Sequence, residues 1–405
     1  MRIAMLSAHS CPVGQLGTKD TGGMSVYIRE LARELGKQGH KIDIFTRVHD
    51  PRDSLTEALA KNVRLVHLRV GGEEEMHKLV LYSYLPDFAC ALEAFRKEQG
   101  LKYDLIFSHY WLSAQVGQEV KGWWGTPNVA MFHTLGVIKN SLGVGEEEPD
   151  LRLETEKELA QNCDRIIATT EREKTLLVDV CGSSPRRVGV VPCGVNSRIF
   201  RPIERGAARA AVGLGDEKVV LFVGRIEPLK GIDLLMHAFA SLPSKEDTKL
   251  VIIGGDEESD DEIDELSRLS DRLQMQGMVT FPGAVKHELM PYYYNAADVC
   301  VVPSHYESFG LVALESLACG TPVVATDVGD LTNIIRDGET GYVIDDHSAE
   351  SLSEKIAEVL AWPKRSTRRT RLIRGSVAGH SWANVAKQIE GEFQIALAAQ
   401  PAAAR

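Results

Sequence analysis

The sequence predicts an α/β protein of two doubly wound domains, and three observations support this fold class. Short apolar segments alternate with amphipathic segments of helical period along the whole chain. These apolar segments fall into two series, which are separated by an irregular, Pro- and Gly-containing stretch at residues 190–208. The length of 405 residues is long for one domain and suits two. Continuous apolar strands between helices are typical of parallel sheets that are covered on both faces.

Each series predicts six strands. The first set is RIAML (2–6), KIDIFT (41–46), VRLVHL (63–68), DLIFSH (104–109), NVAMFH (128–133) and RIIATT (165–170). The second set is VVLFVGR (219–225), KLVIIGG (249–255), MVTFPG (278–283), DVCVVP (298–303), PVVAT (322–326) and TGYVI (340–344). We therefore expect an N-terminal domain over residues 1–195 and a second domain over 196–380. Ligands of doubly wound sheets bind beyond the carboxyl ends of the strands, so a cleft between the domains is the expected site.

Helices are expected between these strands and at the end of the chain. Residues 24–39 (MSVYIRELARELGKQG) have helical period. Ser381 is a suitable N-cap for an amphipathic helix in the last segment, 381–405. We expect this C-terminal helix to pack back on the N-terminal domain and to be followed by a frayed tail.

Composition excludes several classes of function. The formal net charge of −11 argues against a nucleic-acid-binding protein, because phosphate backbones require a basic surface. No segment approaches the ~20 apolar residues of a membrane-spanning helix, and the N-terminus lacks the features of a signal peptide. Seven scattered cysteines without a CxxC pair or zinc spacing predict no structural metal and a reducing, cytoplasmic location; they are Cys11, Cys90, Cys163, Cys181, Cys193, Cys300 and Cys319.

A glycine-rich segment opens the first long helix. In GTKDTGGMSVYIREL (17–31), the pair Gly22-Gly23 permits close backbone approach to a ligand at a helix N-terminus. The segment lacks the GK[ST] of a Walker A motif, and it is not the G-x-G-x-x-G of nicotinamide-dependent enzymes. A glycine turn without a ligand is the alternative interpretation.

A pair of cations follows the first strand of the second series. In FVGRIEPLKGIDLLMHAF (222–239), Arg225 comes directly after the strand and Lys230 five residues later. Two cations at the carboxyl end of a buried strand suit a diphosphate. The alternative is that they are charges on a solvent-exposed loop.

Two glutamates flank a predicted helix start. In YESFGLVALESLACGTPVVAT (306–326), the helix should begin near Phe309 or Gly310, with Glu307 before it and Glu315 inside it. On a helix the two would lie only about 80° apart, so they can address two ends of one extended ligand. A surface ion pair plus a capping glutamate is the alternative.

The order and spacing of these segments resemble the retaining family-4 glycosyltransferases of GT-B fold. The resemblance runs from GGMSVY through HTLGVIKN, GRIEPLKG and ESFGLVALESLACGTPVVAT to GETGYVIDD. It implies a UDP-linked nucleotide-sugar donor, no cofactor and no essential metal. It also implies front-face attack, in which the leaving diphosphate helps to deprotonate the acceptor.

The same resemblance assigns the donor-binding positions. Arg225 and Lys230 would bind the diphosphate together with the backbone amides of Phe309, Gly310 and Leu311. Glu315 would bind the ribose, Glu307 a sugar hydroxyl, and His133 the C6 hydroxyl near the reaction centre. Gly23 would close over the phosphate, and Val285 and Lys286 would edge the base. Arg225, Lys230, Glu307 and His133 are the expected catalytic residues.

The acceptor side resembles two subfamilies. One, from the mycothiol pathway, transfers N-acetylglucosamine from UDP to inositol phosphate; the other comprises sucrose-phosphate synthases. The resemblance implies that Lys78, Tyr110, Thr134 and Arg152 surround an acceptor phosphate. Ser25 stands where the mycothiol-pathway enzymes have an inositol-contacting Asn. We therefore expect a phosphorylated polyol or sugar as acceptor, with another sugar or a lipid as the alternative.

Two hypotheses of other classes predict different behaviour. A nucleotide-sugar epimerase would convert its substrate without an acceptor. A sugar-nucleotide sensor would bind the nucleotide and turn nothing over. The partners expected in every case are small molecules, and the chain could also form a homodimer.

Overall fold

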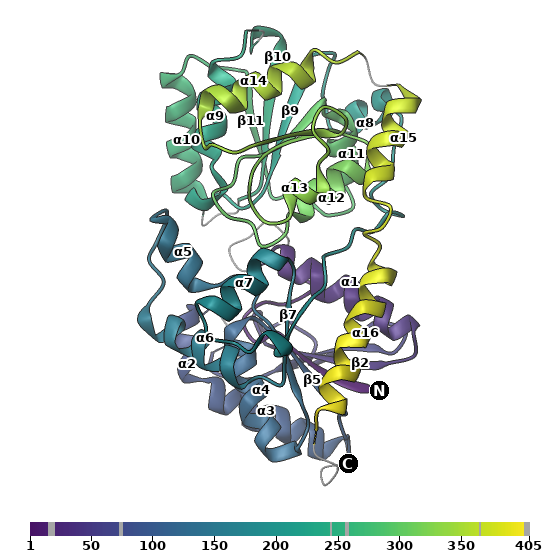
Figure 1. Ribbon diagram of the computed structural model, residues 1–405. Coiled ribbons are helices and arrows are strands. Elements are labelled where there is room, and N and C mark those ends of the chain that lie inside the picture. Colours follow the sequence, from purple (N-terminus) through teal and green to yellow (C-terminus); the bar gives the residue numbers. More distant parts are fainter. Residues whose placement is uncertain (15–20, 73–75, 244, 256–258, 364–365, 401–405) are drawn as a thin grey trace.

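The structure contains two parallel-stranded sheets, each in its own lobe (Figure 1). It is a computed structural model, which describes residues 1–14, 21–72, 76–243, 245–255, 259–363 and 366–400. Part of the glycine-rich segment, residues 15–20, lies outside these ranges, as does the end of the tail. All twelve predicted strands are present, so the two-sheet prediction is confirmed.

The first sheet has eight strands in the order β3-β4-β2-β1-β5-β6-β7-β8. Their bounds are β1 (Arg2–Leu6), β2 (Lys41–Arg47), β3 (Thr56–Ala60), β4 (Val63–Leu68), β5 (Leu105–His109), β6 (Asn128–Met131), β7 (Arg165–Ala168) and β8 (Val188–Val190). Two of them, β3 and β8, were not predicted. Strand β3 also corrects the expectation of a purely parallel sheet, because it pairs with β4 in the antiparallel direction at the exposed edge.

The second sheet has six strands in the order β11-β10-β9-β12-β13-β14, and all the neighbouring pairs are parallel. Their bounds are β9 (Lys218–Val223), β10 (Thr248–Ile253), β11 (Val279–Gly283), β12 (Val299–Val302), β13 (Val323–Thr326) and β14 (Gly341–Ile344). In each sheet the chain adds strands first on one side of the first strand, β1 or β9, and then on its other side, as in doubly wound sheets.

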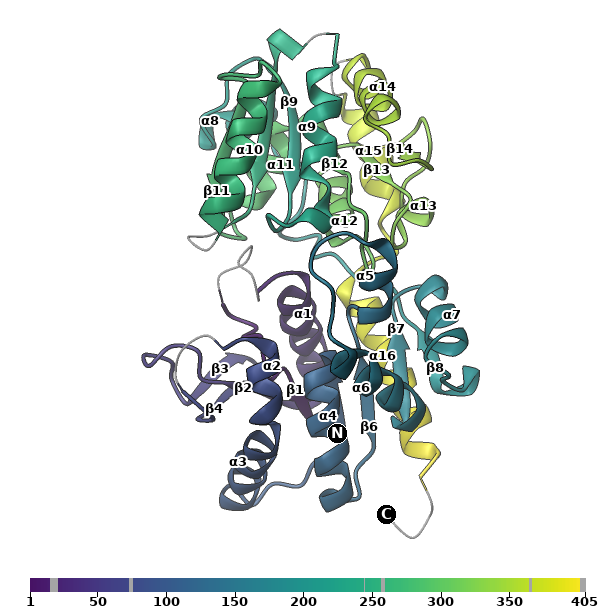
Figure 2. The same cartoon turned by 90° about the vertical axis from the view of Figure 1, so that its left-hand side faces the viewer.

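Helices cover both faces of each sheet (Figures 1 and 2). The first lobe carries α1 (Gly23–Lys37), α2 (Lys78–Ser83), α3 (Leu85–Glu98), α4 (Tyr110–Trp124), α5 (Gly136–Leu142), α6 (Asp150–Asn162), α7 (Glu171–Asp179) and the 3₁₀ turn η1 (Pro185–Arg187). The second carries α8 (Arg205–Ala211), α9 (Ile232–Ala240), α10 (Asp260–Arg272), α11 (Met290–Ala296), α12 (Leu311–Ala318), α13 (Leu331–Ile334), α14 (Ala349–Leu360), α15 (Thr367–Ser376), and the turns η2 (Pro228–Lys230) and η3 (Lys245–Asp247).

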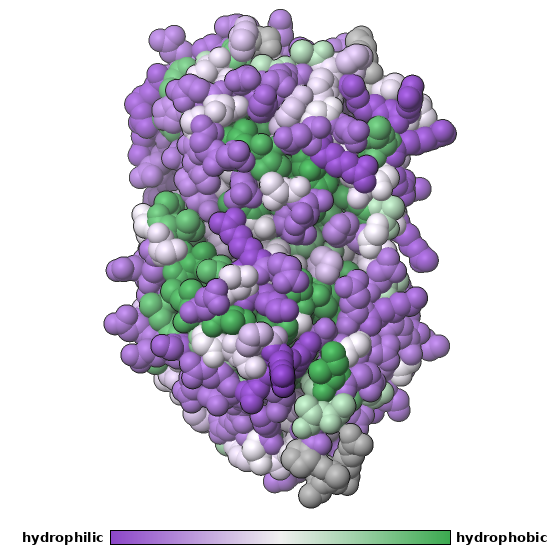
Figure 3. Space-filling model, in the orientation of Figure 1, coloured by the Kyte–Doolittle hydropathy of each residue, from purple (hydrophilic) through white to green (hydrophobic). Residues whose placement is uncertain are grey.

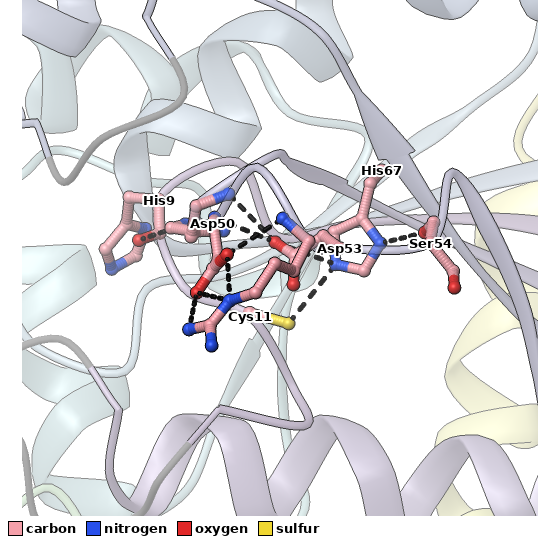
Figure 4. A network of polar contacts seen from close by, with 8 residues as sticks. His9, Cys11, Asp50, Asp53, Ser54 and His67 are labelled. Carbon is pink, nitrogen blue, oxygen red and sulfur yellow. Dashed lines mark hydrogen bonds and ion pairs between the residues drawn. The ribbon is translucent and has the colours of Figure 1, made fainter.

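A polar network ties together the loops that follow β1 and β2 (Figure 4). Nδ1–H of His67 donates to the carbonyl oxygen of Ser54 at 2.7 Å, which leaves Nε2 to accept from the Cys11 thiol at 3.5 Å. Burial raises the pKa of Cys11 to about 11, in keeping with a thiol that donates. Asp53 Oδ2 accepts two backbone N–H groups, from residues 49 and 50, at 3.0 Å each. The network joins residues 9–11, which follow β1, to residues 49–54, which follow β2, and to His67 of β4.

The last helix, α16 (Trp382–Ala398), returns from the second lobe to the first (Figure 1). Ser381 caps it as predicted, since its side chain accepts the N–H of Asn384. The helix packs against α1 and β7. At its start Val195 N–H donates to His380 O at 2.7 Å, so the two segments that connect the lobes lie side by side.

We predict that Trp382→Ala lowers the free energy of unfolding by about 3–5 kcal/mol. The Trp382 ring is 4% exposed and meets the edge of the buried Tyr27 ring at a centroid distance of 5.3 Å. Chemical denaturation measures the change. Ile395→Ala is the control on the same helix, because Ile395 is 48% exposed and should cost little. Equal losses in the two variants would contradict this account of how α16 docks.

Candidate active site

A cavity lies between the two lobes, at the carboxyl ends of both sets of strands. It brings together most of the ligand-binding residues that the sequence analysis predicts. Those that line it are Gly23, Lys78, Tyr110, His133, Thr134, Arg152, Arg225, Lys230, Val285, Glu307, Phe309, Gly310, Leu311 and Glu315.

Two nominated residues, Ser25 and Lys286, are not among the lining residues. Ser25 lies on the inner face of α1, is fully buried, and its hydroxyl is 2.9 Å from that of Ser10. Lys286 is exposed. It is the next residue, His287, whose side chain turns inward and lines the cavity. The ligand contacts predicted for Ser25 and for the backbone at Lys286 stay predictions.

Two helix N-termini point into the cavity, one from each lobe. Gly22 precedes α1, and Gly310, with φ of 116°, precedes α12. A Cβ at Gly23 would lie 3.3 Å from Leu311 Cδ1, so the two helix starts approach each other closely. Because N-terminal turns carry unpaired N–H groups and a positive dipole end, this part of the cavity favours an anion.

Carboxylates hold both cations on this side of the cavity. Lys230 Nζ is 2.7 Å from Glu307 Oε1, which also accepts from Ser304 Oγ at 2.9 Å. Arg225 Nη2 is 2.8 Å from Glu227 Oε1. Lys230 and Glu307, to which the sequence analysis gives separate ligand-binding roles, thus form a direct ion pair. A bound anion could exchange with these carboxylates and leave Glu307 to accept hydrogen bonds from hydroxyl groups.

Glu315 lies inside α12, four residues after Leu311, and lines the same cavity. Tyr294 OH donates to its Oε2 at 2.8 Å, and His287 Nε2 lies 3.6 Å from its Oε1. Arg29 donates to His287 Nδ1 at 3.4 Å, which fixes the imidazole with its N–H toward Glu315. Glu315 is therefore held in place as a hydrogen-bond acceptor at the cavity wall.

His133 is paired with a second, fully buried histidine. Its Nε2 lies 2.9 Å from His109 Nδ1, so one ring donates and the other accepts. Burial lowers the pKa of His133 to about 3 and that of His109 well below its ordinary value. His133 also has φ of 61°, and Tyr110, the residue after His109, has φ of 75°. Such left-handed conformations cost about 1–3 kcal/mol each and collect at functional sites.

We predict that this neutral pair makes the protein acid-sensitive. An unfolded histidine has a pKa of about 6.5, so the unfolded chain takes up protons that the folded pair does not. Stability is therefore complete above pH 6.5 and falls as the pH falls toward 3. Between pH 7.5 and pH 5, the free energy of unfolding should fall by about 2 kcal/mol less in His109→Gln than in the wild type.

Denaturant titrations at the two pH values measure this difference. His237→Gln, at an exposed position on α9, is the matched control and should keep the wild-type pH dependence. A His109→Gln variant with the pH dependence of the wild type would show that the pair is not neutral.

The opposite end of the cavity is organised around Arg152. Its Nε donates to Glu156 Oε1 at 2.7 Å, and its Nη2 donates to Thr134 Oγ1 and O at 3.0 and 3.1 Å. Its Nη1 lies 2.7 Å from Glu148 Oε1, and the guanidinium stacks 4.9 Å from the ring centroid of Tyr110. Tyr110, Thr134 and Arg152 thus form one cluster, with Lys78 at the start of α2 also facing the cavity.

Sequence reasoning missed two charged residues of this cluster. Lys139 of α5 and Glu148, which precedes α6, line the cavity and form an ion pair with each other. Lys139 stands in HTLGVIKN, one of the segments that carry the family resemblance, so the sequence could have indicated this residue. Nothing in the sequence singles out Glu148 from its neighbours Glu146 and Glu147.

Some exposed apolar side chains lie on the helices around this cluster. Figure 3 shows apolar side chains gathered over the part of the first lobe where α5 and α6 lie. Leu142 at the end of α5 is 37% exposed, and Leu151 at the start of α6 is 39% exposed. These two leucines are the exposed large apolar side chains of the two helices that supply Lys139 and Arg152.

Two features are absent from the ranges that the structure describes. Within them, no group of three or more His, Cys, Asp or Glu side chains is arranged to hold a metal ion. In the same part of the chain, no helix is long and apolar enough to cross a membrane.

The fold and the cavity define a class of protein, the GT-B glycosyltransferases, and comparisons with known proteins agree. Residues 21–198 match the model of Glycosyltransferase Family 4, and residues 204–374 match that of Glycosyl transferases group 1. The sucrose-phosphate synthase of Thermosynechococcus elongatus has the same fold, with a TM-score of 0.89 and 34% identity over 98% of this chain and 99% of that one. HepE of Anabaena, in complex with UDP-glucose, has a TM-score of 0.75 and 18% identity over 96% and 98% of the two chains.

One relative is similar to this chain over almost its whole length. The D-inositol 3-phosphate glycosyltransferase of Thermomonospora curvata is 40% identical over 392 residues, which cover 93% of this chain and 90% of that protein. The chain belongs to the family-4 glycosyltransferases and is an enzyme of that family. The predicted fold and family are both confirmed.

Proposed function

We propose that this enzyme transfers a hexosyl unit from a UDP-linked sugar to a phosphorylated polyol or sugar, with retention and without a metal. The observation that carries the proposal is how the cationic and hydrogen-bonding groups are divided between the two sides of the cavity. Its second-lobe side offers Arg225, Lys230 and the α12 N-terminus, and its first-lobe side offers Lys78, Tyr110, Thr134 and Arg152. Two anion-binding ends with hydroxyl-binding groups between them suit a diphosphate donor and a phosphorylated acceptor.

The relatives support the acceptor class. The names of two of them, one 40% and one 34% identical, contain a phosphorylated small molecule: D-inositol 3-phosphate in one and sucrose phosphate in the other. Both similarities extend over more than nine-tenths of this chain.

The proposed mechanism depends on the donor diphosphate as leaving group. The bond between the sugar C1 and the diphosphate oxygen breaks, and the acceptor oxygen bonds to C1 from the same face. The acceptor proton passes to the departing phosphate oxygen. Lys230, Arg225 and the N–H groups at the start of α12 would stabilise the charge that develops there, so catalysis is electrostatic and positional.

The neutral His133 would act in this mechanism as a hydrogen-bonding group and not as a general base. Its Nε2 is engaged with His109, and its low pKa leaves little basicity at neutral pH. Its other ring nitrogen remains for a sugar hydroxyl.

An acceptor array tests the proposed function directly. UDP-glucose, UDP-N-acetylglucosamine and GDP-mannose are each supplied with inositol phosphates, hexose phosphates and the corresponding neutral compounds. We expect transfer from a UDP-sugar to a phosphorylated acceptor, an unchanged anomeric configuration by NMR, and full activity in EDTA. Transfer only to neutral acceptors, or conversion of the donor without any acceptor, would contradict the proposal.

We predict that Lys230→Ala lowers kcat by at least about 100-fold, because it removes a cation from the leaving diphosphate. Steady-state kinetics with the acceptor found in the array measure the change. Lys249→Ala is the control: Lys249 lies on β10, pairs with Glu217 at 3.4 Å and does not line the cavity. A near-normal kcat in Lys230→Ala would rule out the electrostatic mechanism.

We also predict that Lys78→Ala raises the KM of the acceptor about tenfold and changes the KM of the donor less than about twofold. Lys78 lines the first-lobe side of the cavity, opposite the donor cations. Lys121→Ala is the control, because Lys121 pairs with Asp164 at 2.8 Å on the outer side of α4. Equal effects on the two KM values would argue against an acceptor pocket at Lys78.

A further inference from the structure

The guanidinium of Arg152 has no free edge in this structure. A phosphate held by two parallel hydrogen bonds needs either the Nε–Nη2 edge or the Nη1–Nη2 edge of an arginine. The first edge is occupied by Glu156 and Thr134, and the second by Glu148 and Thr134. An acceptor phosphate can therefore bind Arg152 in this way only if one of these partners leaves.

Glu156 is fixed in place. It is 1% exposed, and both of its oxygens are engaged, Oε1 by Arg152 and Oε2 by the backbone N–H of Gly136 at 2.7 Å. Moving it would leave a buried N–H and a buried cation without partners, which is costly. Glu156 is thus a permanent partner of the arginine.

Glu148 differs from Glu156 in exposure and attachment. Its side chain is 17% exposed and lines the cavity. Its carboxylate lies between two cations, Lys139 and Arg152. Burial would raise the pKa of Glu148, but Arg152 and Lys139 lower it, so the group is an anion.

The backbone of Glu148 stays in position when its side chain moves. Asn140 Oδ1 accepts the Glu148 N–H at 2.7 Å, and Asn140 Nδ2 donates to the Glu148 carbonyl at 2.9 Å. The carboxylate can therefore rotate toward the open cavity without unfolding the start of α6. Only side-chain torsions and two ion pairs change.

We propose that Glu148 is a specificity-determining residue: its carboxylate occupies the anion position between Lys139 and Arg152, and an acceptor phosphate binds by taking its place. This inference rests on the proposed function, since it concerns the acceptor phosphate of the same cavity. Only an anion that outcompetes a carboxylate for both cations would enter. A neutral polyol would leave Glu148 in its ion pairs and gain neither cation.

The test compares Glu148→Gln with Glu147→Gln. Both changes remove one negative charge, but Glu147 is exposed and does not line the cavity. Calorimetric titration of the full chain with myo-inositol 1-phosphate and with myo-inositol, in saturating UDP to fill the donor site, gives the two dissociation constants. We expect Glu148→Gln to bind the phosphate ester about five- to tenfold more tightly, with the affinity for myo-inositol unchanged. Glu147→Gln should behave as the wild type in both titrations.

Glu148→Asp provides a second variant that keeps the charge. Its shorter side chain cannot reach both cations, so it should bind the phosphate ester more tightly than the wild type and less tightly than Glu148→Gln. A weaker or unchanged affinity in both variants would overturn the proposal, because Glu148 would then support Arg152 instead of competing with the phosphate. The binding readout does not depend on turnover, so a failure of the proposed function would appear separately, as wild-type enzyme that transfers to no phosphorylated acceptor.

Discussion

The direction of the strands is the constraint on which the rest of this molecule depends. Of the fourteen strands in the described residues, all except β3 run in the common direction of their sheet, so the carboxyl ends of these strands lie on one side of each sheet. The helix after a strand then begins on that side and presents its N–H groups there. Because α16 and the segment around Val195 tie the lobes together, the two sides face each other across one cavity. Residues far apart in sequence meet there as a consequence.

Within the cavity, cations and anions are already paired. Lys230 is held by Glu307, Arg225 by Glu227, and Arg152 by Glu148 and Glu156. Partly buried cations without counter-charges would repel one another and destabilise the fold, so these carboxylates stabilise it by neutralising them. A phosphate that enters replaces an anion that is already present. The net binding free energy of the phosphate is therefore its interaction with the cations minus that of the carboxylate that it replaces. This difference favours ligands with more than one negative oxygen.

The sequence predicted the fold well where burial dictates pattern, and less well elsewhere. Most of the twelve predicted strands are largely apolar and buried, although β11 lies at a sheet edge and is partly exposed. In contrast, β3 reads TEALA and is half exposed, and β8 has three residues, so neither carries a strong signal. Arg225, Lys230 and Glu307 could be placed because they follow buried strands. The rotation of α1, which turns Ser25 inward, and the docking of α5 on α6, which brings Lys139 to Glu148, depend on tertiary packing that no local pattern records.

The return of α16 also has a consequence for synthesis on the ribosome. Tyr27, in the first helix of the chain, is covered by Trp382, more than three hundred residues later. The first lobe can assemble its sheet as it emerges, but it keeps an apolar face of α1 and β7 exposed until the second lobe has been made. A truncation before residue 382 would expose the same face permanently. The two lobes therefore complete their folding together, although each has its own sheet.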